Sequence, residues 1–469
     1  MPTENEGDKN KVTLRKKTSA SFSISKKSIG IWVHFIKNQL FRSTSIIRPT
    51  SLNLKQKNTQ QAELTVSPIK EYRRGKSIDF SHDLEKNPLE IDTKKVGEPE
   101  KQGTQSHIIF FKLTNNKKKR WLLTIEKKGG SSIKNEIYIF KTINENENFI
   151  NVKVKNLFSV PFHSEIKESI NIIYSRLQIN GDLKRHVHYI HTQLENKDLD
   201  SLHYLFTQFH RLILALKFLH NESFKDENGI LHRGIVHGDI KPGNILLNSQ
   251  AALILSDFGC AHFFDQPVKE IGTVSYVAPE LYYYDHNNAY ENIGRSDIWS
   301  LGFILYCLLT KQDPVEKIST EIKNLTKKSI TVPPGYTQAP RVEIKQSDLV
   351  QGNSSKVLLA QWGKDYSKSN LCKDAKSAKN YLTTQLGNTP NPTSDSYLFK
   401  RNLLLKFSLM MLLPVEERPS AEELIQIMKK LSQHFDLNKN LDPFISNILH
   451  QVPPVYIETT SSKSLYKTL

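Results

Sequence analysis

The sequence predicts an α+β fold in which a small antiparallel sheet precedes a mostly helical region. Two observations support this prediction. Residues 108–127 contain apolar runs and the two-residue alternation that is typical of strands. Residues 205–219 and 298–308 instead repeat apolar side chains every three or four positions, as buried helices do. The chain has 469 residues, which is enough for one large two-part domain with ordered appendages or for two ordinary domains.

The first expected elements are two strands and one helix behind them. The apolar run 108–113 is typical of a strand, and residues 121–127 alternate to one side of a second, antiparallel strand. A glycine turn follows, and apolar residues then recur every three or four positions over 133–143. We therefore expect an amphipathic helix that covers a small sheet.

The second half is expected to be helical, with one short hairpin. Between the helices at 205–219 and 298–308, the apolar runs 245–247 and 253–255 are separated by polar turn residues. This arrangement predicts a small β-hairpin.

A polar segment and a capped helix follow. Residues 311–395 are rich in Lys, Ser, Thr, Asn and Pro, so we expect an insertion with little core of its own. Helical pattern resumes at Leu403, and Ser420 with Glu423 forms the capping box of one more helix. Residues 436–469 are expected to be a C-terminal tail.

The net charge of +17 is concentrated at the start of the chain. Residues 1–60 hold 12 Lys and Arg against 3 acidic residues, so we interpret 1–95 as a basic, low-complexity N-terminal region. A solvated flexible tail and contact with an acidic membrane surface are the alternatives. The apolar helical spacing of residues 29–40 fits a basic interfacial helix or docking onto the folded domain. We expect no specific nucleic acid partner.

The cysteines and the opening residues predict the compartment. Cys260, Cys307 and Cys372 are too few for a disulfide framework and fit a reducing environment. The opening MPTENEGD is acidic where a secretory leader would be basic, so no such leader is expected. The expected location is cytoplasmic.

Three short segments carry the candidate chemistry. In 236–247, the carboxylate of Asp239 is suited to accept a hydroxyl proton, and Lys241 to neutralise a moving phosphate. Asn244 and Asp257 offer amide and carboxylate oxygens to a metal ion. The third segment, 272–280, reads GTVSYVAPE. The order and spacing of the three segments are far more specific evidence of function than any one segment alone.

With these motifs the chain resembles the eukaryotic-type protein kinases over about 108–431. The resemblance implies a bilobal protein kinase fold with a small antiparallel-sheet N-lobe and a mostly helical C-lobe. We place the domain at 96–435, with the N-lobe at 96–178 and the C-lobe at 179–435. The polar insertion 311–395 lies where the family places substrate-docking helices.

The resemblance also assigns roles to the catalytic segment. It implies that Asp239 is the catalytic base, Lys241 a catalytic lysine that contacts phosphate, and Asn244 and Asp257 the Mg²⁺ ligands. ATP and Mg²⁺ are the implied cofactors, and proteins are the implied substrates. Lys241 together with Thr273 is similar to the serine/threonine branch of the family.

The sequence match that implies the nucleotide-binding residues of the N-lobe is less specific. Lys127 is our choice for the ATP-binding lysine, and Glu136 for the helix glutamate that orients it. Lys127 and Lys128 both end a strand, and either could instead be solvated. Asp182, just before a helix, could contact the ribose or be a lone surface carboxylate.

Two further contacts are implied within the C-lobe. Glu280 and Arg418 are expected to form the buried ion pair of the family. Asp297 is expected to hold the catalytic loop from a buried helix.

The chain departs from the family pattern at two places. No phosphate-covering glycine loop is recognisable, because Gly97 and Gly103 lack the usual spacing. Gly238 stands where an arginine usually precedes the catalytic aspartate, so the pocket that reads a phosphorylated activation loop has lost its main cation. We therefore expect activity without phosphorylation of Thr273 or Ser275.

Alternatives of different class remain open. The first is an active serine/threonine kinase; the second is a pseudokinase or kinase-fold interaction module; the third is a small-molecule kinase, which the APE motif at 278–280 disfavours. The bias to Lys, Asn and Ile, together with Gly238 and the polar end 458–469, also resembles effector kinases that intracellular bacteria deliver into host cells. An ordinary tail explains the polar end equally well.

Overall fold

The computed structural model describes residues 92–95, 106–115, 120–166, 170–268, 271–283, 292–329, 353–385, 396–435 and 439–452. Almost all of the basic region predicted at 1–95 lies outside these ranges, as do Gly97, Gly103 and the polar end at 458–469. In the part of the chain that is described, no helix has both the length and the apolar character to cross a membrane.

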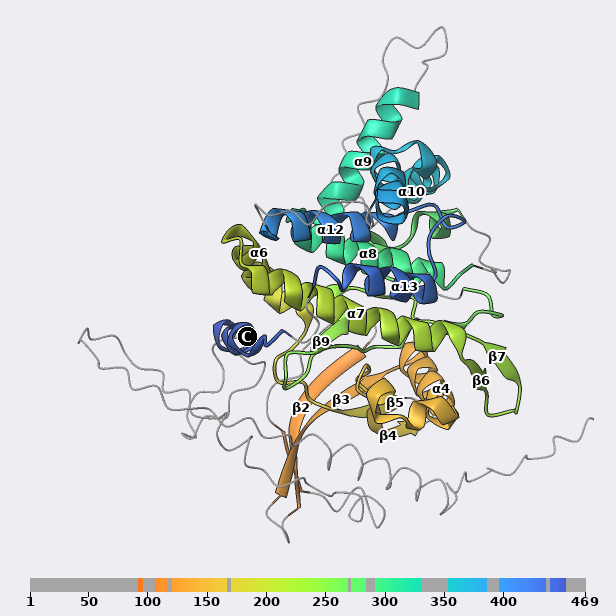
Figure 1. Cartoon of the computed structure of the whole chain (residues 1–469). Helices are drawn as coiled ribbons and strands as arrows, with labels where there is room; N and C mark the ends of the chain where they lie inside the picture. Colours follow the sequence, from red (N-terminus) through yellow and green to blue (C-terminus); the bar gives the residue numbers. More distant parts are fainter. Residues whose placement is uncertain are drawn as a thin grey trace, which may run out of the picture. The chain divides into compact units, whose positions relative to one another are not determined.

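A five-stranded antiparallel sheet forms the first part of the fold, in the order β1-β2-β3-β5-β4 (Figure 1). Its strands are β1 (Asp92–Lys95), β2 (Ser106–Asn115), β3 (Arg120–Gly129), β4 (Pro161–Ile166) and β5 (Asn171–Arg176). The central strand β3 pairs with both β2 and β5, so that Lys127 lies opposite Ile108 on one side and Ile173 on the other. The two strands predicted from sequence are confirmed.

Helix α4 (Ser131–Glu145) packs against this sheet. It begins directly after the glycine turn, and its apolar residues recur every three or four positions. Ile133 and Ile137 are therefore buried against Ile173 of β5. The predicted helix at 133–143 is confirmed. Two short segments, η2 (Glu147–Ile150) and α5 (Val152–Lys155), lead from α4 to β4.

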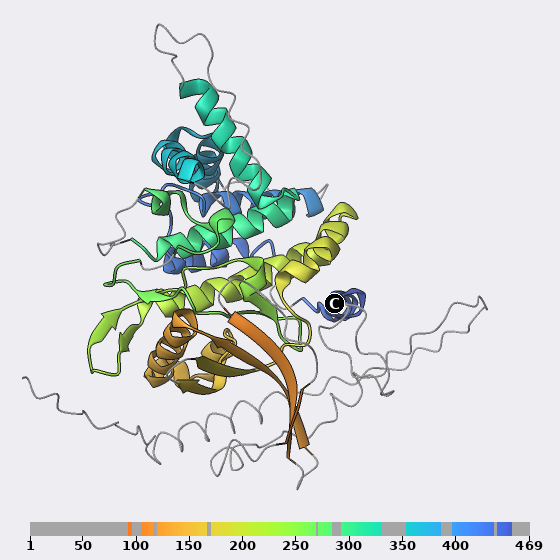
Figure 2. The same cartoon turned by 180° about the vertical axis from the view of Figure 1, so that it is seen from behind.

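The second part of the fold is mostly helical. Its main helices are α6 (Leu183–Glu195), α7 (Leu199–Asn221), α8 (Arg295–Thr310), α12 (Ser396–Met410) and α13 (Ala421–Leu431). Helix α7 lies against α12 and α13, and α8 against α12, as the two opposite views agree (Figure 2). Leu205, Phe209 and Leu216 of α7 are fully buried in the main core. The helices predicted at 205–219 and 298–308 are confirmed, as is the capping box of Ser420 and Glu423 at the start of α13.

Short strand pairs and turns between α7 and α8 carry the loops of the site. They are β6 (Ser223–Lys225), β7 (Leu231–Arg233), β8 (Ile235–Val236), η3 (Pro242–Asn244), β9 (Ile245–Leu247), β10 (Leu253–Leu255), β11 (His262–Phe263), η4 (Val274–Tyr276) and η5 (Pro279–Tyr282). β6 pairs with β7, β8 with β11, and β9 with β10. The predicted hairpin at 245–255 is confirmed as β9 and β10.

The segment 311–395 contributes to a buried cluster where we expected little core. It contains α9 (Pro314–Ser329), α10 (Asn353–Asp365), η6 (Tyr366–Lys368), α11 (Asn370–Asn380) and the π-helical turn η7 (Tyr381–Gln385). Trp362 and Tyr366 are buried against Trp299 of α8, with ring centroids 6.3 Å and 4.9 Å from the Trp299 ring. The core of this segment is thus shared with α8.

Helix α14 (Asp442–Gln451) lies within the segment expected to be a tail. Phe444 and Ile448 are buried in the main core, and the Phe444 ring lies 5.0 Å from that of Tyr204 on α7. Ordered, buried structure therefore continues beyond residue 435.

Candidate active site

The loop after β8 is held in place by Asp297 of α8. Its carboxylate accepts hydrogen bonds from the backbone N–H groups of His237 (2.8 Å) and Gly238 (3.0 Å), and His220 Nε2 lies 2.9 Å from Oδ2. Burial alone would raise the pKa of Asp297, but the contacts with His220 and His237 outweigh burial and lower it. The predicted contact between Asp297 and this loop is confirmed.

Gly238 has a backbone conformation that favours glycine. Its φ is +78°, and a Cβ added here would lie 2.8 Å from the carbonyl oxygen of Cys260. A larger residue would be strained both by the torsion and by this approach. Glycine therefore suits the backbone at position 238, where the family resemblance leads us to expect an arginine.

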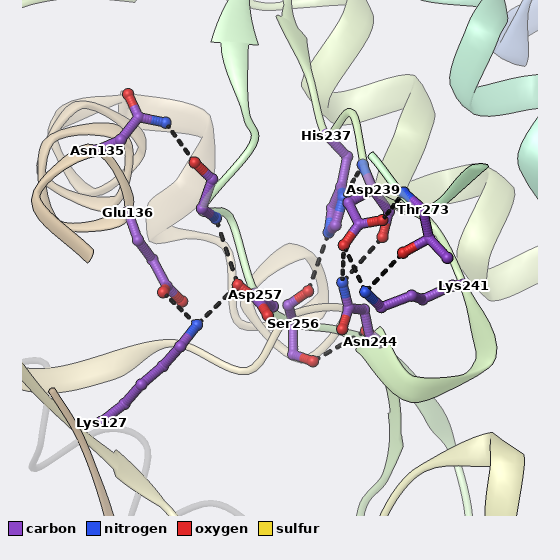
Figure 3. Close-up of polar contacts among 11 residues, drawn as sticks. Lys127, Asn135, Glu136, His237, Asp239, Lys241, Asn244, Ser256, Asp257 and Thr273 are labelled. Carbon is purple, nitrogen blue, oxygen red and sulfur yellow. Dashed lines mark hydrogen bonds and ion pairs between the residues drawn. The ribbon is translucent and has the colours of Figure 1, made fainter. Parts of the chain in front are cut away.

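Asp239 is the centre of one group of polar contacts (Figure 3). Its Oδ2 accepts hydrogen bonds from Lys241 Nζ (2.8 Å) and Asn244 Nδ2 (3.0 Å), and its Oδ1 accepts one from the backbone N–H of Thr273 (2.7 Å). Lys241 Nζ also donates to the Thr273 hydroxyl at 2.8 Å. The structure thus brings the two predicted catalytic residues together with Asn244 and with Thr273 of the segment 257–280, which the resemblance implies is the activation segment.

Lys127 is the centre of the second group. Its Nζ donates to Glu136 Oε2 on α4 (2.8 Å) and to Asp257 Oδ1 (2.7 Å), as Figure 3 shows. Burial alone would lower the pKa of Lys127, but the two carboxylates raise it, so the ammonium stays charged. Lys127 thus contacts two further predicted site residues, of which Asp257 is 130 positions away in the sequence.

The turn that carries Asp257 joins the two parts of the fold. Asp257 has a φ of +64°, which is uncommon for a residue with a side chain and often accompanies functional sites. Phe258 is fully buried, with its ring 4.7 Å from Phe140 of α4 and 4.7 Å from His237. The position of α4 is therefore coupled to the loop that carries the catalytic residues.

Sequence reasoning missed Asn135. Its Nδ2 donates to the carbonyl oxygens of Gly259 (3.1 Å) and Ala261 (2.7 Å) and so attaches α4 to the turn after Asp257. Its place next to Glu136 is the only local signal, and that signal does not reveal partners more than a hundred residues away.

The donor atoms of Asn244 and Asp257 fit the predicted magnesium ion. The amide nitrogen of Asn244 is used by Asp239, which leaves the amide oxygen as an acceptor. The Asp257 side chain is 38% exposed, so its carboxylate is accessible. Mg²⁺ prefers such oxygen ligands and is usually held by one or two protein groups together with substrate phosphates.

Asp182 does not take part in either group of contacts. It is the N-cap of α6, where its Oδ1 accepts a hydrogen bond from the backbone N–H of Arg185 at 3.2 Å. Burial raises the pKa of Asp182 despite this hydrogen bond. The geometry assigns it a capping role, and contact with a ribose stays a prediction.

The predicted ion pair between Glu280 and Arg418 is confirmed. Arg418 Nη1 donates to Glu280 Oε1 at 2.7 Å and Nη2 to Oε2 at 3.0 Å, and the Arg418 side chain is fully buried. This bidentate contact fixes the end of the activation segment on the C-lobe core.

We expect Arg418→Met to destabilise the fold by about 3 kcal/mol, because it leaves the buried Glu280 carboxylate without its partner. Urea unfolding would measure the change. Lys376→Met is the control: it breaks the exposed pair with Glu417 (2.9 Å) and is expected to cost at most about 1 kcal/mol. If both variants lose the same free energy of unfolding, the result would contradict the importance of the buried pair.

Known proteins resemble this chain over the region that contains the site. The family model described as "Protein kinase domain" matches residues 101–440. CBL-interacting protein kinase 9 of Oryza sativa is 32% identical over 146 residues, which are 29% of this chain and 29% of that protein. Serine/threonine-protein kinase CHK1 of Saccharomyces cerevisiae is 37% identical over 120 residues, 24% of this chain and 20% of that protein. Aurora kinase of Debaryomyces hansenii is 28% identical over 219 residues, 45% of this chain and 47% of that protein. The chain spans less than half the length of these curated relatives.

Proposed function

The chain belongs to the protein kinase domain family, and on that premise we propose that it is an ATP-dependent serine/threonine protein kinase. The bilobal protein kinase fold predicted from sequence is confirmed by this membership and by the sheet and helices described above. The observation that carries the proposal is the contact of Lys127 with both Glu136 and Asp257. A module with no catalytic task has no physical need for a largely buried ammonium between two carboxylates, because such groups are costly to desolvate.

The residues of the two groups divide the proposed reaction among them. Asp239 accepts the proton of the attacking hydroxyl, and Lys241 stabilises the charge of the phosphoryl group during transfer. Lys127, oriented by Glu136, binds the ATP phosphates. Asn244 and Asp257 would hold Mg²⁺, which neutralises phosphate charge when bound.

We further propose that the enzyme is active without phosphorylation of its activation segment. Gly238 offers no cation to a phosphate at Thr273 or Ser275, and Thr273 is already held by Asp239 and Lys241. Two other cations are candidates for this role: Arg211, which donates to the carbonyl oxygen of Asn156, and Lys269, which lies outside the described residues.

One experiment tests both proposals. The protein is treated with phosphatase, shown by mass spectrometry to be unmodified at Thr273 and Ser275, and assayed with Mg·ATP and a basic protein substrate. We expect phosphate on serine and threonine at the rate of untreated protein. Transfer to tyrosine alone would contradict the acceptor class. A rate that collapses after treatment and recovers on rephosphorylation would contradict independence from phosphorylation.

Two wider proposals rest on sequence alone. We propose that the basic N-terminal region contacts acidic membranes, and unchanged sedimentation with phosphatidylserine vesicles after deletion of residues 1–60 would contradict this.

We also propose that the chain is delivered into a host cell cytosol, as the resemblance to bacterial effector kinases implies. Unchanged delivery of a reporter fusion after deletion of 458–469 would contradict an export signal at that end.

A further inference from the structure

A β-hairpin lies beside α4 and joins α7 to the catalytic loop. It consists of β6 and β7, and Figure 1 shows it next to α4. Asn146, which follows α4, donates to the carbonyl oxygen of Ser223 at 3.0 Å, and Asn148 donates to Glu222 Oε2 at 2.8 Å. Phe224 is fully buried. The hairpin is therefore packed against the N-lobe as well as the C-lobe.

The turn of this hairpin presents a buried carboxylate to α4. Asp226 Oδ1 accepts hydrogen bonds from the backbone N–H groups of Asn228 (2.9 Å) and Ile230 (2.8 Å) and so shapes the turn. Asp226 Oδ2 accepts a hydrogen bond from the hydroxyl of Tyr138 on α4 at 3.3 Å. Burial and the nearby Asp226 raise the pKa of Tyr138 to about 12, so its hydroxyl keeps the proton that it donates.

The other strand of the hairpin is attached to the segment that follows Asp257. His232 Nδ1 lies 3.0 Å from both carboxylate oxygens of Asp265, and its ring stacks on Phe263 of β11 at 4.0 Å. His232 Nε2 lies 3.5 Å from Asp226 Oδ2. The contacts from Tyr138 through Asp226 and His232 thus run from α4 to the start of the activation segment.

The geometry of α4 gives these contacts a consequence for the site. Glu136 and Tyr138 are two positions apart, or about 200° around an α-helix, so they lie on opposite faces. On one face of α4, Glu136 accepts a hydrogen bond from Lys127. On the opposite face, Tyr138 donates one to Asp226 of the hairpin. A displacement of α4 that separates Tyr138 from the hairpin would change the position of Glu136 as well.

We propose that the β6–β7 hairpin positions α4 for ATP binding, with Tyr138 and Asp226 as positioning residues that act through Glu136. The inference rests on the proposed kinase activity for its effect on ATP, whereas its effect on α4 is independent of any reaction.

The first test compares KM and kcat for ATP. Tyr138→Phe removes the hydroxyl but keeps the ring edge against Phe263, and Asp226→Asn keeps an oxygen acceptor for the turn. We expect each variant to raise KM for ATP about tenfold, the effect of one charge-assisted hydrogen bond. The controls Tyr189→Phe on α6 and Lys225→Ala, an exposed position of the same hairpin, should leave KM unchanged. A lower kcat with unchanged KM would indicate only fewer folded molecules and would overturn the proposal.

The second test needs no catalysis. Amide hydrogen exchange is measured without nucleotide, and in both variants we expect several-fold faster exchange in α4 with unchanged exchange in α13. Unchanged exchange in α4 would overturn the proposal even if the enzyme is active. If wild type transfers no phosphate but exchange in α4 still accelerates in the variants, the positioning role stands and the proposed function fails.

Discussion

Asp257→Ala is expected to abolish phosphoryl transfer while the protein stays folded. The substitution removes the carboxylate proposed to hold Mg²⁺ and the acceptor 2.7 Å from Lys127 Nζ. Metal-ion stabilisation is worth several kcal/mol, and each 1.36 kcal/mol is tenfold in rate, so we expect a loss of about 1,000-fold or more. Initial rates of phosphate transfer at saturating Mg·ATP would measure it.

The control for this prediction addresses the unusual backbone of residue 257. Its φ of +64° is strained for alanine, whereas asparagine tolerates such torsions as well as aspartate does. Asp257→Asn should therefore keep the unfolding midpoint of wild type and still lose activity. A variant with near-normal turnover would contradict the metal role of Asp257.

Lys127→Ala is expected to lower activity by about 100- to 1,000-fold, the usual effect of removing one charged group that stabilises the reacting atoms. Lys128→Ala is expected to change it little. Adjacent strand residues point to opposite faces of a sheet, and only Lys127 reaches Glu136 and Asp257. The fold should persist in Lys127→Ala, because burial raises the pKa of Glu136 and lets the carboxyl take up a proton.

The comparison of kcat/KM for ATP in the two lysine variants decides this prediction. Circular dichroism would show that both variants are folded. A larger loss in Lys128→Ala than in Lys127→Ala would contradict the assignment of the ATP-binding lysine.

Local patterns explain which parts of the fold were predictable. The two-residue period of β3 was enough to select Lys127 over Lys128, and the three-to-four-residue period predicted α4, within which the family resemblance placed Glu136. The hairpin of β9 and β10 and the capping box at Ser420 also follow from a few adjacent residues. The motifs then brought distant residues together through the family resemblance.

The features that were missed depend on contacts between distant segments. Tyr138 and Asp226 are 88 positions apart, and nothing in either local sequence indicates their hydrogen bond. Trp362 lies in a polar stretch, so its burial against Trp299 could not be predicted from composition. Phe444 of α14 is buried only because α6 and α7 offer a surface for it. Tertiary packing, rather than local preference, decided each of these cases.

The most direct test of the proposed function is phosphate incorporation from Mg·ATP by wild type and by Asp239→Ala, measured by mass spectrometry on a protein substrate. Asp239 has hydrogen bonds with Lys241, Asn244 and Thr273, and we propose it as the base that accepts the hydroxyl proton. We expect phosphoserine or phosphothreonine with wild type and a loss of about 100- to 10,000-fold with Asp239→Ala. Equal incorporation by both proteins, or none by either, would contradict it and favour a pseudokinase or interaction module.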